Sequence, residues 1–93
     1  MSLPMKSIML YYFKDQAEHW DYELVDRLMN ETGKNSEFWK WQFRFWLMEF
    51  LSCGLLQDTE YSADDGSHFR EGNVLSRYKI TELGLQRIET MLE

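Results

Sequence analysis

Residues 36–54, SEFWKWQFRFWLMEFLSCG, are the stretch that decides the fold of this 93-residue chain. The stretch opens with residues that commonly cap helices and closes on Gly54, a residue that commonly follows a helix end. We therefore predict a long helix that begins after Asn35 or Ser36 and runs to Cys53. At about 100° per residue, five apolar side chains fall on one side of it. These residues, which we expect to face the core, are Trp39, Phe43, Trp46, Leu47 and Phe50.

The opposite side of the same helix is also apolar, and it carries Phe38, Trp41, Phe45 and Met48. A helix that reads the major groove presents polar and basic side chains to the base edges. A helix that is apolar nearly all round is buried on both sides. We therefore expect this second side to pack on the first or last helix of the chain, or on a partner chain in a homodimer.

The segments around the long helix complete the pattern. A first helix is expected from about Lys6, and a second spans 21–30, with Asp21 as its N-cap and Gly33 as its stop. Two extended segments, 55–61 and 77–80, are joined by a polar loop and predict a hairpin with a long tip. Thr81 is expected to cap a last helix with four residues on its apolar side, namely Leu83, Ile88, Met91 and Leu92.

This order of helix, helix, helix, strand, strand, helix predicts a mainly α protein with a β-hairpin, which is an α+β fold. The order is typical of a winged helix-turn-helix, and we expect a single such domain over residues 1–93. The chain is too short for two domains, and its hydrophobic content of 44% excludes disorder.

Composition also predicts the compartment. The only cysteine, Cys53, has no partner for an internal disulfide, which indicates a reduced, cytoplasmic protein. No apolar run reaches the roughly 18 residues that a membrane span requires, so no membrane association is expected.

Three segments together resemble PadR-type regulators within the wider MarR/PadR-type winged-helix superfamily. Residues 19–28, HWDYELVDRL, and the following Glu31-Thr32-Gly33 are similar to the second-helix signature of that family. Phe43, Leu47 and Phe50 before Gly54-Leu55-Leu56 resemble its spaced apolar residues. Residues 77–84, RYKITELG, resemble its second wing strand and the start of the next helix.

The resemblance implies a DNA-binding transcription regulator, usually dimeric, whose third helix enters the major groove while the wing touches the backbone. Two features depart from the family pattern. The third helix lacks the usual Tyr-Pro or Tyr-Arg pair, and the chain ends without the family's further dimerisation helix. The alternative is a winged-helix module for protein association or dimerisation that does not bind DNA.

Candidate contact residues for double-stranded DNA lie on the third helix and the wing. The set is Lys34, Lys40, Trp41, Arg44, His68, Arg70, Arg77 and Lys79. The alternative assigns Phe38, Trp41, Phe45 and Met48 to a protein interface. Residues 34–57 carry three bases against two acids, whereas residues 58–71 carry five acids against one base. An acidic wing repels phosphates within a Debye length of about 8–10 Å, so the third helix is the better candidate for a DNA contact.

Residues with catalytic or metal-binding chemistry are sparse. His19 and His68 lie on different segments without the spacing of a metal site, and no glycine-rich phosphate-binding run is present. Asp64 and Asp65 lie in a turn and are expected to be solvated. The sequence therefore predicts no enzyme, no metal and no cofactor.

Overall fold

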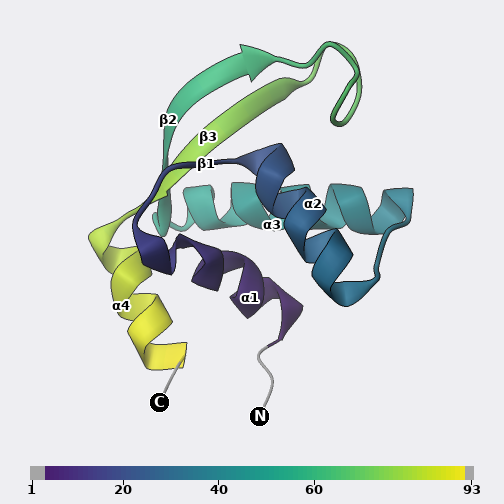
Figure 1. The fold of residues 1–93 in the computed structure, drawn as a ribbon. Helices are drawn as coiled ribbons and strands as arrows, with labels where there is room; N and C mark the ends of the chain where they lie inside the picture. The colour runs from purple at the N-terminus through teal and green to yellow at the C-terminus, as the bar shows by residue number, and fades with distance from the viewer. Residues whose placement is uncertain (1–3, 92–93) are drawn as a thin grey trace.

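The computed structural model describes residues 4–91 (Figure 1). Over these residues the chain forms an α+β fold with four α-helices and a three-stranded antiparallel sheet. In chain order the elements are α1 (Met5–Tyr11), the 3-10 helix η1 (Tyr12–Asp15), β1 (His19–Trp20), α2 (Asp21–Thr32), α3 (Glu37–Ser52), β2 (Leu56–Ala63), β3 (Val74–Ile80) and α4 (Glu82–Met91).

The sheet has the strand order β1-β3-β2, with β3 in the centre. Leu56 pairs with Ile80 at the base of the hairpin and Ala63 pairs with Val74 at its far end, with an irregularity between Asp58 and Glu60. Both hairpin strands are longer than the sequence predicts. The third strand, β1, was not predicted, because two residues are too few for a strand pattern and only pairing with β3 defines them.

Three of the predicted helix ends are confirmed. The Ser36 hydroxyl accepts a hydrogen bond from the Trp39 N–H at 3.4 Å, and the Thr81 hydroxyl accepts one from the Gly84 N–H at 3.0 Å. Gly33 ends α2 with a φ of 73°, a conformation that glycine adopts without strain. The prediction for Asp21 is wrong.

Asp21 is the first residue of α2, and Trp20 stands at the N-cap position. The Asp21 carboxylate accepts a hydrogen bond from the Ser76 N–H at 3.2 Å, so it joins α2 to β3. Its side chain is buried. The tertiary contact with the sheet therefore outweighs the local preference of aspartate for the cap.

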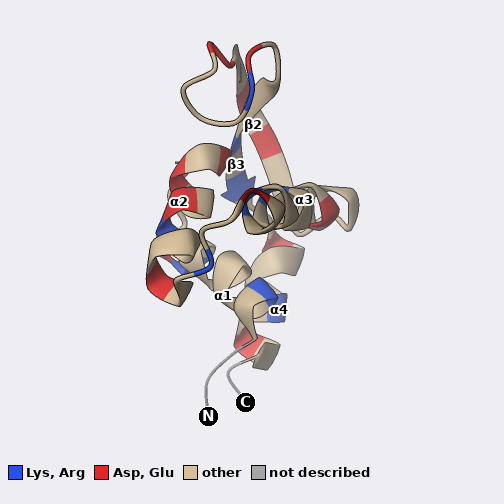
Figure 2. Cartoon of the chain, turned by 90° about the vertical axis from the view of Figure 1, so that its right-hand side faces the viewer, with Lys and Arg blue, Asp and Glu red and all other residues tan. Residues whose placement is uncertain are grey.

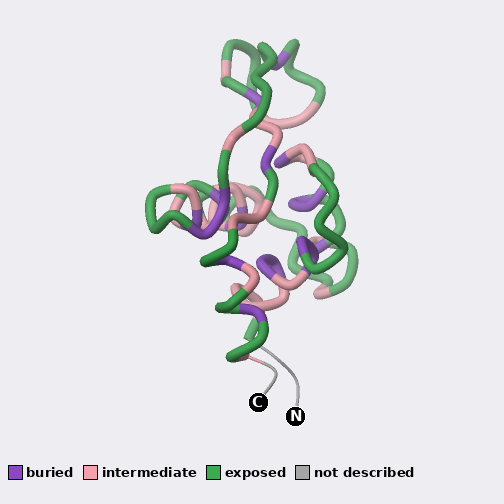
Figure 3. Tube along the Cα trace, turned by 90° about the vertical axis from the view of Figure 1, so that its left-hand side faces the viewer, coloured by how far each residue is buried: buried purple, intermediate pink, exposed green. Residues whose placement is uncertain are grey.

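The core lies between the helices and the sheet, where the buried segments of the trace gather (Figure 3). Phe43, Leu47 and Phe50 of α3 are buried there, and Trp39 and Trp46 pack against it. The predicted core side of the long helix is therefore confirmed. The helices α1 and α4 lie on the side of α3 away from the hairpin (Figure 1).

The apolar side of α4 is confirmed only in part. Ile88 is buried and Met91 packs against the core, but Leu83 is 50% exposed. Gly84 takes the buried position instead, because α4 begins close against the chain at Leu55 and Ile80. Leu92, also predicted for this side, lies outside the described residues.

Within residues 4–91, no helix has the length and apolar character needed to cross a membrane.

Candidate functional site

The second apolar side of α3 is solvent-exposed. Phe38 is 66% exposed, Phe45 is 53% exposed and Met48 is 43% exposed, while Trp41 between them is half-buried. We refer to these four residues as the apolar stripe. The expectation that the first or last helix covers this side is wrong, because α1 packs on α3 from the core side and α4 packs on α1 and β3.

The stripe forms one wall of an open groove of about 700 Å³. Successive stripe residues lie three, four and three positions apart, so they follow one line along α3. The polar residues that line the groove beside the stripe are Glu37, Gln42, Arg44 and Arg70. The groove therefore has an apolar wall on one helix and a rim of mixed charge.

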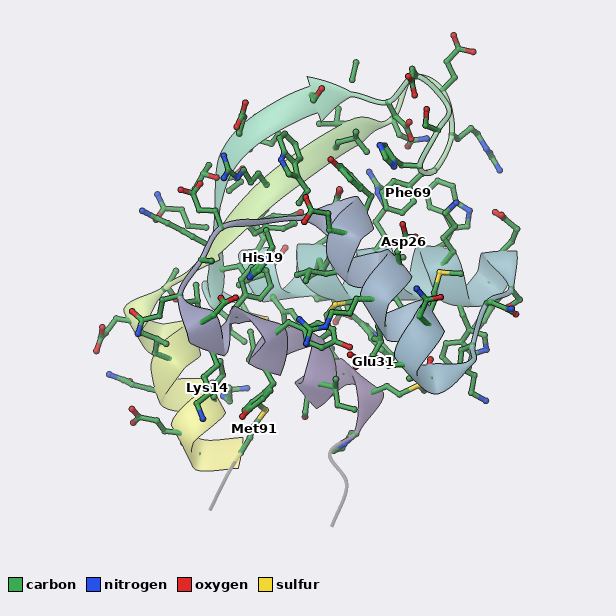
Figure 4. All side chains as sticks on the ribbon, viewed as in Figure 1. Lys14, His19, Asp26, Glu31, Phe69 and Met91 are labelled. Atoms are coloured by element: carbon green, nitrogen blue, oxygen red, sulfur yellow. The ribbon has the colours of Figure 1, made fainter. Side chains whose placement is uncertain are left out.

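The loop between β2 and β3, residues 64–73, folds back toward α2 and α3 (Figures 1 and 4). We refer to it as the hairpin loop. Asp64 organises it, since its carboxylate accepts hydrogen bonds from the N–H groups of Gly66 at 2.9 Å, Phe69 at 2.7 Å and Arg70 at 3.1 Å. The prediction that Asp64 is solvated is wrong, because its side chain is buried beneath these amides. Asp65 is exposed, as predicted.

The same hydrogen bonds determine the charge state of Asp64. Burial by itself disfavours the ionised carboxyl, but the backbone donors stabilise it more, so the pKa lies below its ordinary value. The carboxylate therefore stays ionised at neutral pH and holds the loop in its folded-back shape.

Phe69 is the residue that joins the hairpin loop to α3, and Figure 4 shows it between the loop and the helices. Its ring centroid lies 5.7 Å from that of Trp41. The Arg44 guanidinium lies 5.1 Å from the Phe69 centroid and the Lys40 ammonium lies 5.6 Å from it. Arg70 in turn lies 5.5 Å from the Trp41 ring. We refer to these five residues as the cation–aromatic cluster, in which each cation is within the range of a cation–π contact.

Arg44 also fastens α3 to the hairpin. Its Nη2 donates to the Val74 carbonyl at 3.1 Å, while its buried Nε has no acceptor among the described residues. Part of the donor capacity of Arg44 is thus committed within the chain, and the rest borders the groove.

The structure brings together four of the eight predicted DNA-contacting residues, namely Lys40, Trp41, Arg44 and Arg70. The other four have different surroundings. His68 stacks on Tyr22 of α2 with centroids 3.7 Å apart, and Lys34 lies over Trp39. Arg77 pairs with Glu60 at 3.3 Å on the hairpin, and Lys79 is exposed on β3.

Phe69 was not among the predicted site residues. A single aromatic residue in a polar, acidic loop carries no periodic signal, and its role depends on the loop folding back. The four predicted interface residues, by contrast, lie together on the stripe. Figure 2 shows α3 mostly free of charged residues, while acidic residues gather on α2 and in the hairpin loop.

Asp21 provides the remaining buried charge near Arg44. Burial raises the pKa of its carboxyl above the ordinary value, although hydrogen bonds from Ser76 and Tyr22 and the charges of Arg44 and His68 oppose the shift. Among the described residues, no group of three or more His, Cys, Asp or Glu side chains could hold a metal ion.

Comparisons of the chain with protein-family models, with curated proteins and with solved structures gave no match.

Proposed function

We propose that the chain is a winged-helix module for protein association, in which the apolar stripe of α3 is the contact surface and the association is homotypic. The observation that carries this proposal is the exposure of Phe38, Phe45 and Met48 along one line of a long helix. Contiguous exposed apolar side chains mark interaction surfaces. The same exposure argues against α3 as a reader of the major groove, where polar side chains are needed.

The winged-helix part of the proposal is supported by the arrangement of the elements. Residues 33–36 join α2 to α3 as the turn of a helix-turn-helix, and the hairpin that follows α3 would be the wing. The short β1 pairs with β3 at the inner edge of this hairpin.

The size of the stripe suits a weak rather than a permanent contact. An aromatic side chain carries roughly 150–250 Å² of surface, so Phe38 and Phe45 leave roughly 250 Å² exposed per chain. A standard stable interface buries about 800 Å² per partner. The exposed aromatic area of the stripe is well below this value, so we expect association that depends on concentration.

The test is sedimentation velocity between about 20 μM and about 1 mM protein, a range that spans weak association. We expect the mass to rise with concentration for the natural chain and to remain that of one chain for Phe45→Asp. Leu83→Asp is the matched control, because Leu83 is 50% exposed but lies on α4 outside the groove. A single-chain mass at every concentration would overturn the proposal.

The cation–aromatic cluster favours a second candidate function, a DNA-binding regulator of the PadR-like type. Arg44 and Arg70 lie over Trp41, and Lys40 lies over the neighbouring Phe69. Lys and Arg drive duplex binding by releasing counterions. Much of the cluster's cationic charge is already directed at its own aromatic rings, which places this candidate second.

Fluorescence anisotropy with labelled duplex DNA at low salt tests the second candidate. If DNA binds through the cluster, Arg70→Ala weakens binding and reduces the salt dependence by about one counterion. Arg87→Ala, an exposed residue on α4, is the control and leaves binding unchanged. Absence of duplex binding at low salt would remove this candidate.

A further inference from the structure

The stripe of α3 has the spacing of a seam between two helices. Phe38, Trp41, Phe45 and Met48 alternate three and four positions apart, and Ser52 continues the series after four more. This alternation is that of the a and d positions of paired helices, which pack side by side along their length. With 16 residues, α3 is about 24 Å long, so a partner helix can follow it over about four turns.

A second copy of this chain offers the surface that matches the seam. Large exposed hydrophobic residues elsewhere in the described chain are Tyr61 and Val74 on the hairpin and Leu83 on α4. None of these forms a line along a helix. The apolar stripe of a second α3 has the same length and spacing, and such a self-complementary contact closes as a two-fold dimer.

The charges that flank the seam determine the direction of the second helix. Glu37 and Arg44 lie one position before Phe38 and Phe45, on one side of the seam. Gln42 and Glu49 lie one position after Trp41 and Met48, on the other side. In a parallel pair, a residue on the Glu37 and Arg44 side of one helix faces the partner's Gln42 and Glu49 side. The residue that it faces lies five positions further along the partner helix.

In the parallel pair, Arg44 therefore faces Glu49 of the partner subunit, and two-fold symmetry repeats the contact. In an antiparallel pair, like sides face each other, and Arg44 approaches Arg44 of the partner subunit near the centre. Opposite charges attract and like charges repel at this range, so the parallel direction is preferred.

Both charged groups are accessible for this contact. Glu49 lies 3.3 Å from Lys6, with side chains 38% and 43% exposed, and exposed ion pairs of this kind are weak. Arg44 donates from Nη2 to the Val74 carbonyl at 3.1 Å and from Nη1 to the Met48 sulfur at 3.9 Å, and its side chain borders the open groove. A thioether sulfur is a weak acceptor, so a carboxylate of the partner subunit can replace it.

We infer that the partner of the stripe is α3 of a second copy, aligned in parallel, with Arg44 of each chain paired to Glu49 of the partner subunit. This inference rests on the proposed function, since it needs homotypic association through the stripe, and it adds the direction and the ion pairs.

A disulfide experiment tests the direction. In the variant Ser52→Cys with Cys53→Ser, the only thiol lies at an exposed seam position. The parallel arrangement brings the two copies of position 52 together, within reach of the roughly 5.5–6 Å between Cα atoms that a disulfide spans. The antiparallel arrangement centred on residue 43 separates them by about 27 Å. We expect a covalent dimer under mild oxidation.

The controls separate the two proposals. Gln86→Cys with Cys53→Ser places the thiol on the exposed side of α4 and should give no covalent dimer. Adding Phe45→Asp to the Ser52→Cys variant should abolish the crosslink. A second measurement needs no substitution, because spin labels on the native Cys53 report the distance between two copies directly.

Three outcomes are decisive. A crosslink that Phe45→Asp abolishes, with a short distance between Cys53 labels, supports the inference. A dimer that is sensitive to Phe45→Asp but gives no crosslink and a label distance near 30 Å overturns the parallel direction and leaves the proposed function standing. A chain that stays single at all concentrations overturns both.

Discussion

At the scale of single residues, two buried carboxylates behave in opposite ways. Asp64 accepts several backbone hydrogen bonds and its pKa is lowered, whereas the pKa of Asp21 is raised because burial outweighs its two hydrogen bonds. A lowered pKa contributes stability above the ordinary carboxyl value of about 3.9, and a raised pKa costs stability there. The two groups therefore contribute to stability with opposite dependence on pH.

Asp64→Asn should loosen the hairpin loop, because the amide replaces one acceptor oxygen with a donor that faces backbone N–H groups. We expect faster hydrogen exchange at the amides of Phe69 and Arg70 and loss of the contact between Phe69 and Trp41. Asp65→Asn is the control and should leave both amides protected. In the natural chain the same opening should appear as pH falls below about 4, through the lowered pKa of Asp64. Unchanged exchange in Asp64→Asn would contradict this role.

Asp21→Asn should change the pH dependence of stability in the other direction. Below about pH 4 the Asp21 carboxyl is protonated in both the folded and the unfolded chain. As pH rises through its raised pKa, the folded chain must ionise a buried group, and stability is lost. The variant avoids this loss, so its stability relative to the natural chain should improve from pH 4 to pH 7 in urea unfolding. A constant difference across this range would show that Asp21 does not titrate in this way.

At the scale of the helix, α3 has two apolar sides with different roles. Phe43 is fully buried and Phe45, two positions on, is 53% exposed. Their energetic contributions to the single chain should differ accordingly, although the two residues are chemically identical.

Phe43→Ala should lower the free energy of unfolding by about 3–5 kcal/mol, since it leaves a cavity in the core. Phe45→Ala should change it by about 0.5 kcal/mol or less, measured by urea unfolding at a concentration where single chains dominate. A large loss in Phe45→Ala under these conditions would mean that the stripe is covered within the chain.

The start of α4 provides a second test at this scale. A Cβ atom at Gly84 would lie 2.3 Å from the Leu55 carbonyl oxygen and 2.6 Å from Ile80 Cγ1. Gly→Ala inside a helix ordinarily stabilises by up to about 1 kcal/mol. Here we expect Gly84→Ala to destabilise by about 1–3 kcal/mol, because the backbone of Leu55 must move. Gln86→Ala, on the exposed side, should be nearly neutral in the same thermal or urea unfolding experiment.

Local sequence patterns predicted some features of the helices and strands and not others. The cap at Ser36 and the stop at Gly33 were predictable, because capping depends on neighbouring residues. The extents of the hairpin strands and the existence of β1 were not, because pairing partners far along the chain define them. For the site, periodicity identified the stripe, but no local pattern indicated that Phe69 would reach Trp41.

At the scale of the whole molecule, the net charge of −6 distinguishes the two candidate functions. Two acidic copies repel each other, and salt screens this repulsion while leaving apolar contact in place. Binding to a duplex shows the reverse, because salt competes with counterion release.

We therefore expect self-association to strengthen, or at least to persist, when salt rises from about 20 mM to about 500 mM, a change that shortens the Debye length several-fold. Sedimentation at fixed protein concentration measures this directly, and Phe45→Asp serves as the monomeric reference. Association that collapses with salt would indicate that charge pairs, and not the apolar stripe, hold the copies together.

The sequence by itself determined the long helix, its core side, its caps and the presence of a hairpin, because these depend on spacing and on neighbouring residues. It also placed Phe38, Trp41, Phe45 and Met48 on one line. Only the tertiary structure decided that Phe38, Phe45 and Met48 of this line stay exposed and that Asp64 folds the hairpin loop back onto α3. Which face of a helix is buried depends on where other elements pack, and that information is spread over residues far apart in the chain.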